Sequence, residues 1–318
     1  MAPTRPDRRW MPLVAAFAVT LTACSGGKGG TTFLSIGTGG TGGVYYPLGG
    51  ALASRLSQAD STRQYTAEVT GGSVENVNRI LAGQIDLGFS LAVTAYEAYH
   101  GSSDFPEPAT HLCIVAPMYP NVTHILVPAS STARSLADLR GKKVSVGSAG
   151  SGTEQISRQL LEAYGLTYDD IEPRYLSFTE SAQALQDGAI DAALISVGIP
   201  AAAVLEATTT DGARLLGVSA DKLAVLKSRY PYYSAGVIPA GAYPGVDAPI
   251  PTVAIMNWLV ARDDLDDQVV ETLLDILDKD RASLARVHEM AKQIDLARLD
   301  DAPIPLHPAV ERWRASRR

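Results

Sequence analysis

Two turns rich in Gly, Ser and Thr are the segments of this sequence best suited to hold a ligand. Residues 34–43 read LSIGTGGTGG and residues 144–153 read VSVGSAGSGT, so each turn follows a short apolar strand. Glycine lets the backbone approach a ligand closely, and free N–H groups at a helix start favour anions. Hydroxyl groups of Ser and Thr add further donors. The pair of turns therefore predicts a cradle for a carboxylate that does not require an arginine.

A helical pattern follows each turn. Leucines recur every four residues over residues 48–56, and Ser151 and Glu154 have the spacing of a capping box. Two more serines, Ser90 and Ser196, are expected at the ends of equivalent strands and in the same cleft. The predicted ligand-binding residues are Thr38, Gly39, Gly40, Thr41, Gly43, Tyr45, Tyr46, Ser90, Ser148, Gly150, Ser151, Gly152, Thr153 and Ser196.

The order of elements around these turns occurs twice. Residues 83–90 read GQIDLGFS and residues 188–196 read GAIDAALIS, and in each case a helical pattern precedes the Gly and the strand ends at Ser. Strands that alternate with helices indicate parallel sheets, so the repeat predicts two α/β lobes. Apolar runs at residues 122–128 and 251–261 are expected to be strands that carry the chain from one lobe to the other and back.

The predicted architecture is therefore a hinged clamshell of two α/β lobes joined by two crossing strands. Lobe I is expected to contain residues 31–126 and 257–318, and lobe II residues 127–256. A helical segment over residues 263–296 is expected to pack on lobe I. The lobes should rotate about the crossing strands when a ligand binds between them.

The N-terminal residues have the pattern of a bacterial lipoprotein signal. Three arginines within the first nine residues precede an apolar run over residues 10–23, which ends in Leu-Thr-Ala before Cys24. We expect residues 1–23 to be the signal peptide, Cys24 to carry lipid and residues 24–30 to be a flexible tether. The alternative is an ordinary signal peptide with an incidental cysteine. Either pattern predicts an extracytoplasmic location, and the first predicts an anchor on the face of the bacterial membrane.

Charge and motif content exclude several function classes. The net charge is −7, and loss of residues 1–23 makes it about −9, which argues against nucleic-acid binding. Neither G-x-S-x-G nor H-E-x-x-H occurs, and the five histidines have no metal-ligand spacing. The cluster of aspartates at residues 263–267 is interpreted as helix-dipole complementation. We expect no catalysis, no cofactor and no metal, and we expect Cys113 to be a buried structural residue without a disulfide partner.

A dinucleotide-binding fold is the sharpest alternative for the first turn. Residues 37–42 match G-x-G-x-x-G after a strand. However, the turn continues through residues 43–47 before a clear helix begins. The best acidic candidate, Glu68, lies in mid-strand and later than the motif expects. Nicotinamide cofactors are also not expected outside the cytoplasm, so the cradle remains the preferred interpretation.

The chain resembles the TAXI-type solute receptors of tripartite ATP-independent periplasmic (TRAP) transporters over nearly all of residues 31–318. The resemblance rests on six motifs in the family's order: IGTGGTGGVYYP at 36–47, GGSVEN at 71–76, GSAGSGT at 147–153, YPYY at 230–233, IPAG at 238–241 and PLHP at 305–308. It implies a type II periplasmic-binding-protein fold, no catalysis, and a membrane partner with small and large transmembrane subunits. Known ligands of the family include glutamate and related C5 acids.

The sequence thus predicts a monomeric receptor that delivers a small carboxylate ligand, namely glutamate, glutamine or 2-oxoglutarate, to a TRAP transporter. A ligand-sensing module for a signalling partner is the alternative, because it would use the same cleft. An enzyme on a similar scaffold is a third class, against which the missing catalytic motifs weigh. Whether Tyr232 or Tyr233 reaches the ligand is left open by the sequence.

Overall fold

The computed structural model describes residues 1–2, 31–209 and 212–317. The predicted cleavage site, Cys24 and the tether lie outside the described residues. Within the described part of the chain, no helix combines the length and the apolar character that crossing a membrane requires.

Ten strands form one mixed sheet in the order β2-β1-β3-β10-β4-β7-β5-β6, with β8 on β4 and β9 on β10. The first half of the chain supplies β1 (Thr32–Gly37), α1 (Tyr45–Ala59), β2 (Arg63–Glu68), α2 (Ser73–Leu81), β3 (Leu87–Leu91), α3 (Ala92–His100), β4 (Leu112–Pro128), β5 (Lys143–Ser145) and α4 (Gly152–Ala163). The second half supplies β6 (Glu172–Arg174), α5 (Phe178–Gln186), β7 (Ala192–Val197), α6 (Ala202–Thr209), β8 (Ala213–Leu216), α7 (Ala220–Arg229), β9 (Ser234–Ile238), β10 (Ile250–Arg262), α8 (Asp267–Lys279), α9 (Arg281–Val287) and α10 (Pro308–Ala315).

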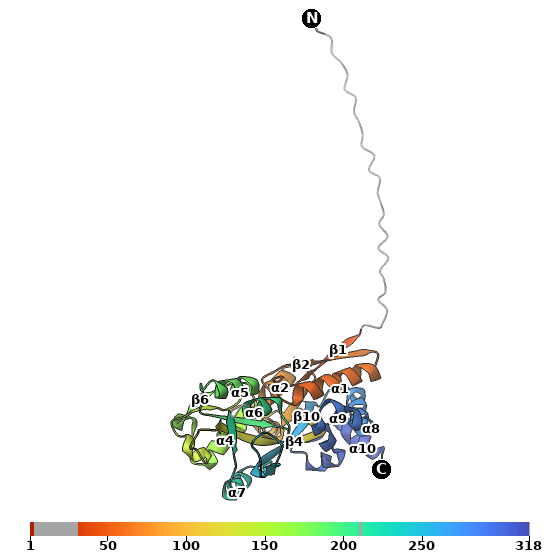
Figure 1. Cartoon of the computed structure of the whole chain (residues 1–318). Helices are drawn as coiled ribbons and strands as arrows, with labels where there is room; N and C mark the ends of the chain where they lie inside the picture. Colours follow the sequence, from red (N-terminus) through yellow and green to blue (C-terminus); the bar gives the residue numbers. More distant parts are fainter. Residues whose placement is uncertain (3–30, 210–211, 318) are drawn as a thin grey trace. The chain divides into compact units, whose positions relative to one another are not determined.

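Strands β4 and β10 each belong to two groups of strands. Residues 112–122 of β4 pair with β10, whereas residues 122–128 pair with β7 and β8. Likewise, residues 257–261 of β10 pair with β3 and residues 250–254 pair with β9. Figure 1 shows these two strands between α4, α5 and α6 on one side and α1, α8 and α9 on the other. We call the part with β1, β2 and β3 group I and the part with β5, β6 and β7 group II. Whether these two groups move as separate lobes remains a prediction.

The internal repeat corresponds to the same strand order in both groups. In group I, β1 lies between the parallel strands β2 and β3; in group II, β5 lies between the parallel strands β6 and β7. Each Ile-Asp pair lies just before the third strand rather than inside it, and its aspartate caps the first strand. A carboxylate oxygen of Asp86 accepts the Ser35 N–H at 2.7 Å, and one of Asp191 accepts the Lys143 N–H at 2.8 Å.

The C-terminal helices pack on group I. Helices α8 and α9 contact α1, which turns Leu48, Leu52 and Leu56 into the core. The expected helical segment over residues 263–296 is broken at Asp280, where α8 ends and α9 begins. At this break the Asp280 carboxylate pairs with Arg55 of α1.

Asn76 of α2 ties together the carboxyl ends of the three parallel strands in group I. Its side chain is fully buried, and its amide donates to the Thr38 carbonyl at 2.7 Å and to the Phe89 carbonyl at 2.9 Å. Its side-chain oxygen accepts the Thr70 hydroxyl at 2.7 Å. These three residues lie after or at the ends of β1, β3 and β2. Asn76 therefore fixes the start of the first Gly-rich turn relative to β3 and to the segment that follows β2.

The two groups meet backbone to backbone near both Gly-rich turns. The Glu75 N–H donates to the Gly150 carbonyl at 3.0 Å, and a Cβ atom on Gly71 would lie 2.7 Å from the Ala149 carbonyl oxygen. A Cβ atom on Gly152 would lie 2.7 Å from Leu91. Glycine is required at these contacts because any side chain would hold the groups apart.

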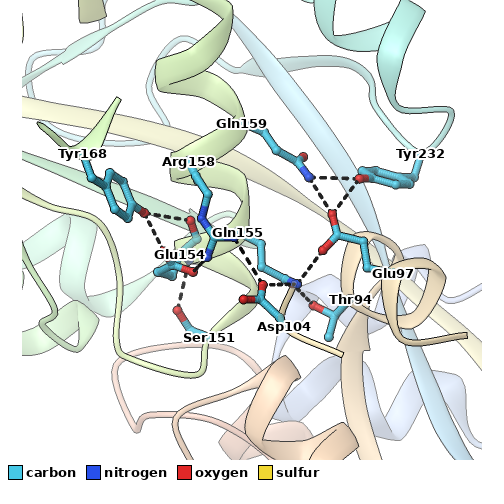
Figure 2. A network of polar contacts seen from close by, with 10 residues as sticks. All are labelled: Thr94, Glu97, Asp104, Ser151, Glu154, Gln155, Arg158, Gln159, Tyr168 and Tyr232. Atoms are coloured by element: carbon cyan, nitrogen blue, oxygen red, sulfur yellow. Dashed lines mark hydrogen bonds and ion pairs between the residues drawn. The ribbon is translucent and has the colours of Figure 1, made fainter. Parts of the chain in front are cut away.

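A polar network also joins α3 of group I to α4 of group II, as Figure 2 shows. The Glu97 carboxylate accepts from the side chains of Gln155 at 2.9 Å, Gln159 at 2.8 Å and Tyr232 at 3.3 Å. Burial, and next the carboxylate of Asp104, raise the pKa of Glu97 above its ordinary value. The network therefore holds a partly desolvated carboxylate at the contact between the groups.

Replacement of Asn76 tests whether the tie among the strand ends matters for stability. Asn76→Asp places a carboxylate against the carbonyl oxygens of Thr38 and Phe89, so we expect the free energy of unfolding to fall by about 3 kcal/mol or more. Asn78→Asp, on the exposed face of the same helix, should change it by less than about 0.5 kcal/mol. Urea unfolding followed by circular dichroism measures both. Equal effects would contradict the role given to Asn76.

The raised pKa of Glu97 predicts a pH dependence of stability. A carboxyl whose pKa is higher in the folded than in the unfolded protein destabilises the fold when ionised, and the penalty is lost as the pH falls toward the unfolded value. The melting temperature of Glu97→Gln minus that of wild type should therefore be more positive at pH 7.5 than at pH 4.5. The hydrogen bonds lost in Glu97→Gln lower the melting temperature by the same amount at both pH values, so this cost cancels when the two pH values are compared. Glu107→Gln, at an exposed position, is the control, and an equal pH dependence there would contradict the assignment.

Candidate ligand-binding site

A cavity of about 50 Å³ lies where the two groups meet. Its lining combines glycines, hydroxyl residues, amides and a few apolar side chains. The lining residues are Gly39, Gly40, Gly43, Val44, Tyr45, Gly71, Gly72, Ser73, Leu91, Tyr119, Asn121, Ser148, Ser151, Gly152, Thr153, Ser177, Phe178, Ser196 and Val197.

Four helices begin at this cavity. The first residues of α1 (Tyr45), α2 (Ser73), α4 (Gly152) and α5 (Phe178) all line it, each with the residue before it. Helices α1 and α2 follow the parallel strands β1 and β2 of group I, and α4 and α5 follow the parallel strands β5 and β6 of group II. The two sets of strands run in opposite directions, because β10 and β4 lie between them as antiparallel neighbours. In α/β proteins, ligands bind beyond the carboxyl ends of parallel strands. Helix starts carry unsatisfied N–H groups and partial positive charge. The cavity is therefore suited to a small anion.

Nine of the predicted ligand-binding residues line the cavity, from both Gly-rich turns and from β7. They are Gly39, Gly40, Gly43, Tyr45, Ser148, Ser151, Gly152, Thr153 and Ser196. Ser151 is also the N-cap of α4, where its hydroxyl oxygen accepts the Glu154 N–H at 3.1 Å. Only this half of the expected capping box forms, because the Glu154 carboxylate turns to Arg158 and Tyr168.

The other five predicted residues do not line the cavity, and each has a local reason. The Thr38 hydroxyl donates to the Glu68 carbonyl at 2.6 Å, and the Ser90 hydroxyl donates to its neighbour's carbonyl at 3.1 Å within buried β3. Thr41 and Tyr46 are exposed to solvent. Gly150 has a φ of +73°, and the turn needs glycine there because other residues rarely adopt that angle.

Several lining residues lie outside the predicted set. The starts of α2 and α5 could have been found with the rule applied to the two Gly-rich turns, because each also follows a strand and precedes a helix. Tyr119 and Asn121 could not, because they lie inside the apolar strand β4 and resemble core residues in the sequence. Tyr232 and Tyr233, left open by the sequence, do not line the cavity; they bond to Glu97 and Gln159.

Asn257 of β10 connects both groups beneath the cavity. Its side-chain oxygen accepts the Tyr45 hydroxyl, and its amide donates to the Tyr119 carbonyl and to the Asn121 side chain, each at 2.7 Å. The Asn121 amide then donates to the Ser196 carbonyl at 2.9 Å. A continuous chain of hydrogen bonds therefore runs from the start of α1 to β7. The Tyr45 ring stacks on Phe89 with centroids 4.8 Å apart, and burial raises the pKa of Tyr45, so its hydroxyl stays a donor.

The cavity lining is electrically neutral apart from these dipoles. Among the described residues that line it, none is Asp, Glu, Lys, Arg or His. The acidic residues in the first turns of α2 and α4 are each paired with an arginine four residues later. Glu75 lies 3.8 Å from Arg79, and Glu154 lies 2.7 Å from Arg158. These charges are only partly offset, because Arg79 lies closer to Glu68 and Arg158 also pairs with Asp104. The Glu75 carboxylate also accepts the Gly71 N–H at 2.7 Å.

Elsewhere in residues 31–209 and 212–317, no group of three or more His, Cys, Asp and Glu is placed to hold a metal ion. The aspartate cluster, interpreted from the sequence as helix-dipole complementation, lies at the start of α8, where Asp266 is the N-cap and Asp267 is in the first turn. It also forms ion pairs: Asp264 with Arg262, Asp266 with Arg63, and Asp267 with Arg312. Cys113 is buried in β4 and free, and burial raises the pKa of its thiol to about 11.

Solved structures share this architecture at low sequence identity. The periplasmic binding protein BugD superimposes with a TM-score of 0.56 at 12% identity, covering 90% of this chain and 96% of that one. A protein of Bordetella bronchiseptica RB50 gives a TM-score of 0.54 at 16% identity, covering 90% and 89%. These likenesses confirm the predicted α/β fold of the periplasmic-binding-protein type.

Two sequence comparisons agree with the fold. A protein of Escherichia coli (strain K12) named "Putative aliphatic sulfonates-binding protein" is 33% identical over 110 residues, which are 35% of this chain and 33% of that protein. The match thus spans about a third of that relative's length. A model described as the NMT1-like family matches residues 36–313, nearly all of the folded part. The chain therefore belongs to the NMT1-like family.

Proposed function

We propose that this protein is an extracytoplasmic solute receptor that captures a small organic anion and delivers it to a membrane transporter. The observation that carries the proposal is the neutral cavity at which four helices begin. Such dipoles bind a carboxylate or sulfonate without a counter-charged side chain. The fold and the name of the E. coli relative support a binding rather than a catalytic role. A carboxylate ligand of the glutamate, glutamine or 2-oxoglutarate kind remains the preferred class, and a sulfonate shares the same chemistry.

Closure around the ligand follows from the same geometry. We propose that groups I and II move as lobes about β4 and β10, because these strands change partners at residues 121–122 and 254–257. The backbone contacts of Gly71 and Gly152 would form only when the lobes close. An open form would give the ligand a wider path to the cavity.

A thermal-shift screen tests the anion proposal. At roughly 100 times the dissociation constant, a bound anion should stabilise the fold by about 3 kcal/mol. The screen contains carboxylates, sulfonates, sugars and neutral amides at equal concentration and pH. We expect only anions to raise the melting temperature. Stabilisation by sugars or cations alone would overturn the proposal.

The partner and the anchor are proposed from the sequence. The TAXI resemblance favours a TRAP transporter, and the lipoprotein pattern favours a lipid on Cys24. Uptake in proteoliposomes that contain the membrane subunits should need an ion gradient but no ATP. Cys24→Ser should move the protein from the membrane to the soluble fraction. An ATP requirement would contradict the first statement, and an already soluble wild type would contradict the second. A sensing role remains the second candidate, which a signalling partner in place of transporter subunits would favour.

A further inference from the structure

Two residues of the cavity lining carry a buried hydroxyl group that has no partner among the described residues. Tyr119 of β4 and Ser196 of β7 are 0% and 3% exposed, and both line the cavity. Among the described residues, neither the Tyr119 hydroxyl nor the Ser196 hydroxyl has a hydrogen-bond partner. Buried polar atoms without partners are rare in native proteins and call for an explanation. A ligand in the cavity would supply the missing acceptors.

Other polar side chains of the lining are already engaged with the protein. The Tyr45 hydroxyl and the Asn121 amide belong to the Asn257 network. The hydroxyl oxygens of Ser73, Ser151 and Ser177 accept backbone N–H groups at 3.1 Å, 3.1 Å and 3.3 Å. The O–H protons of these serines stay free to donate to a ligand as well. Tyr119 and Ser196 differ in that their hydroxyls have no partner at all among the described residues.

The ligand thus meets two kinds of polar partner. The helix starts offer N–H groups and positive potential, which suit an anionic head. Tyr119 and Ser196 come from the strands and offer hydroxyl donors. Burial, and next the nearby Tyr45, raise the pKa of Tyr119 well above its ordinary value, so it remains protonated at neutral pH.

An ammonium group has no matching partner in this cavity. None of the described lining residues is acidic. The carboxylates of Glu75 and Glu154 lie outside the lining, and they share Arg79 and Arg158 with Glu68 and Asp104. A cation at four helix starts would face the unfavourable end of each dipole. The cavity therefore distinguishes simple anions from zwitterions of the same size.

We propose that the ligand is a small anion without an ammonium group, and that its second polar group accepts hydrogen bonds from Tyr119 and Ser196. A keto or hydroxyl oxygen, or a second anionic group, would fill that role. Rather than extending to a new site, this inference rests on the proposed function and narrows its ligand class. Of the acids that the sequence suggested, it favours 2-oxoglutarate over glutamate.

Calorimetric titration with matched pairs tests the ligand class. The probes are 2-oxoglutarate and L-glutamate, pyruvate and L-alanine, and ethanesulfonate and taurine. The members of each pair are of similar size, and only the second carries an ammonium group. Within any pair that binds, we expect the member without ammonium to bind at least about tenfold more tightly, because an unpaired charge would otherwise be desolvated.

Two variants test the hydroxyl contacts with the tightest of these probes. Tyr119→Phe and Ser196→Ala should each weaken binding by about tenfold, the usual effect of one lost hydrogen bond. The melting temperature without ligand should hold or rise, because a buried unpartnered hydroxyl is removed. Tyr65→Phe and Ser157→Ala are matched controls. Both lose a buried unpartnered hydroxyl that is outside the cavity, so binding should stay unchanged.

The outcomes separate this inference from the proposed function. If none of the six probes binds the wild-type protein, the anion receptor is overturned and this inference falls with it. If anions bind but glutamate or taurine binds as tightly as its partner, the receptor stands and the exclusion of ammonium is wrong. If Tyr119→Phe and Ser196→Ala both bind like the wild type, the hydroxyl contacts are wrong.

Discussion

The side-chain amide of Asn257 is the interaction on which the site depends. It is fully buried in β10, and its three hydrogen bonds reach α1 and two positions on β4. Through Asn121 the same network continues to β7 in group II. Each bond lies in a dry interior, where a polar group without partners is costly. The network therefore holds the start of α1 and the strands β4 and β7 in one arrangement.

Local patterns in the sequence predicted much of the fold. The leucine spacing of α1, the Gly-rich turns and the repeated Ile-Asp pairs each act within a few residues or within one repeat, so their effect is visible in the sequence. The break at Asp280 was not predicted, because neither Gly nor Pro marks it in the sequence. Tyr119 was missed for a related reason. A polar group inside a buried strand can be assigned to a cavity only when its neighbours in space are known.

Neutral donors give the cavity a particular physical character. An arginine would attract anions from a distance but would carry a large desolvation penalty into the cavity. Helix starts and hydroxyls are fixed by the fold and require little reorganisation. With the protein acidic as a whole, recognition depends on short-range geometry, and Arg79 and Arg158 partly offset the nearby charges of Glu75 and Glu154.

The double crossing of the chain also determines the order in which its parts can be completed during synthesis. Strands β4, β5, β6, β7 and β8 all come from the continuous stretch 112–216. In group I, by contrast, β3 cannot pair with β10 until residues 250–262 have been made. Before then the edge of β3 that will pair with β10 has no strand beside it, and such an edge invites wrong pairing. The nascent chain can therefore complete the group II part of the sheet before it can complete the group I part. This delay arises from the same two strands that later allow both halves to enclose a ligand.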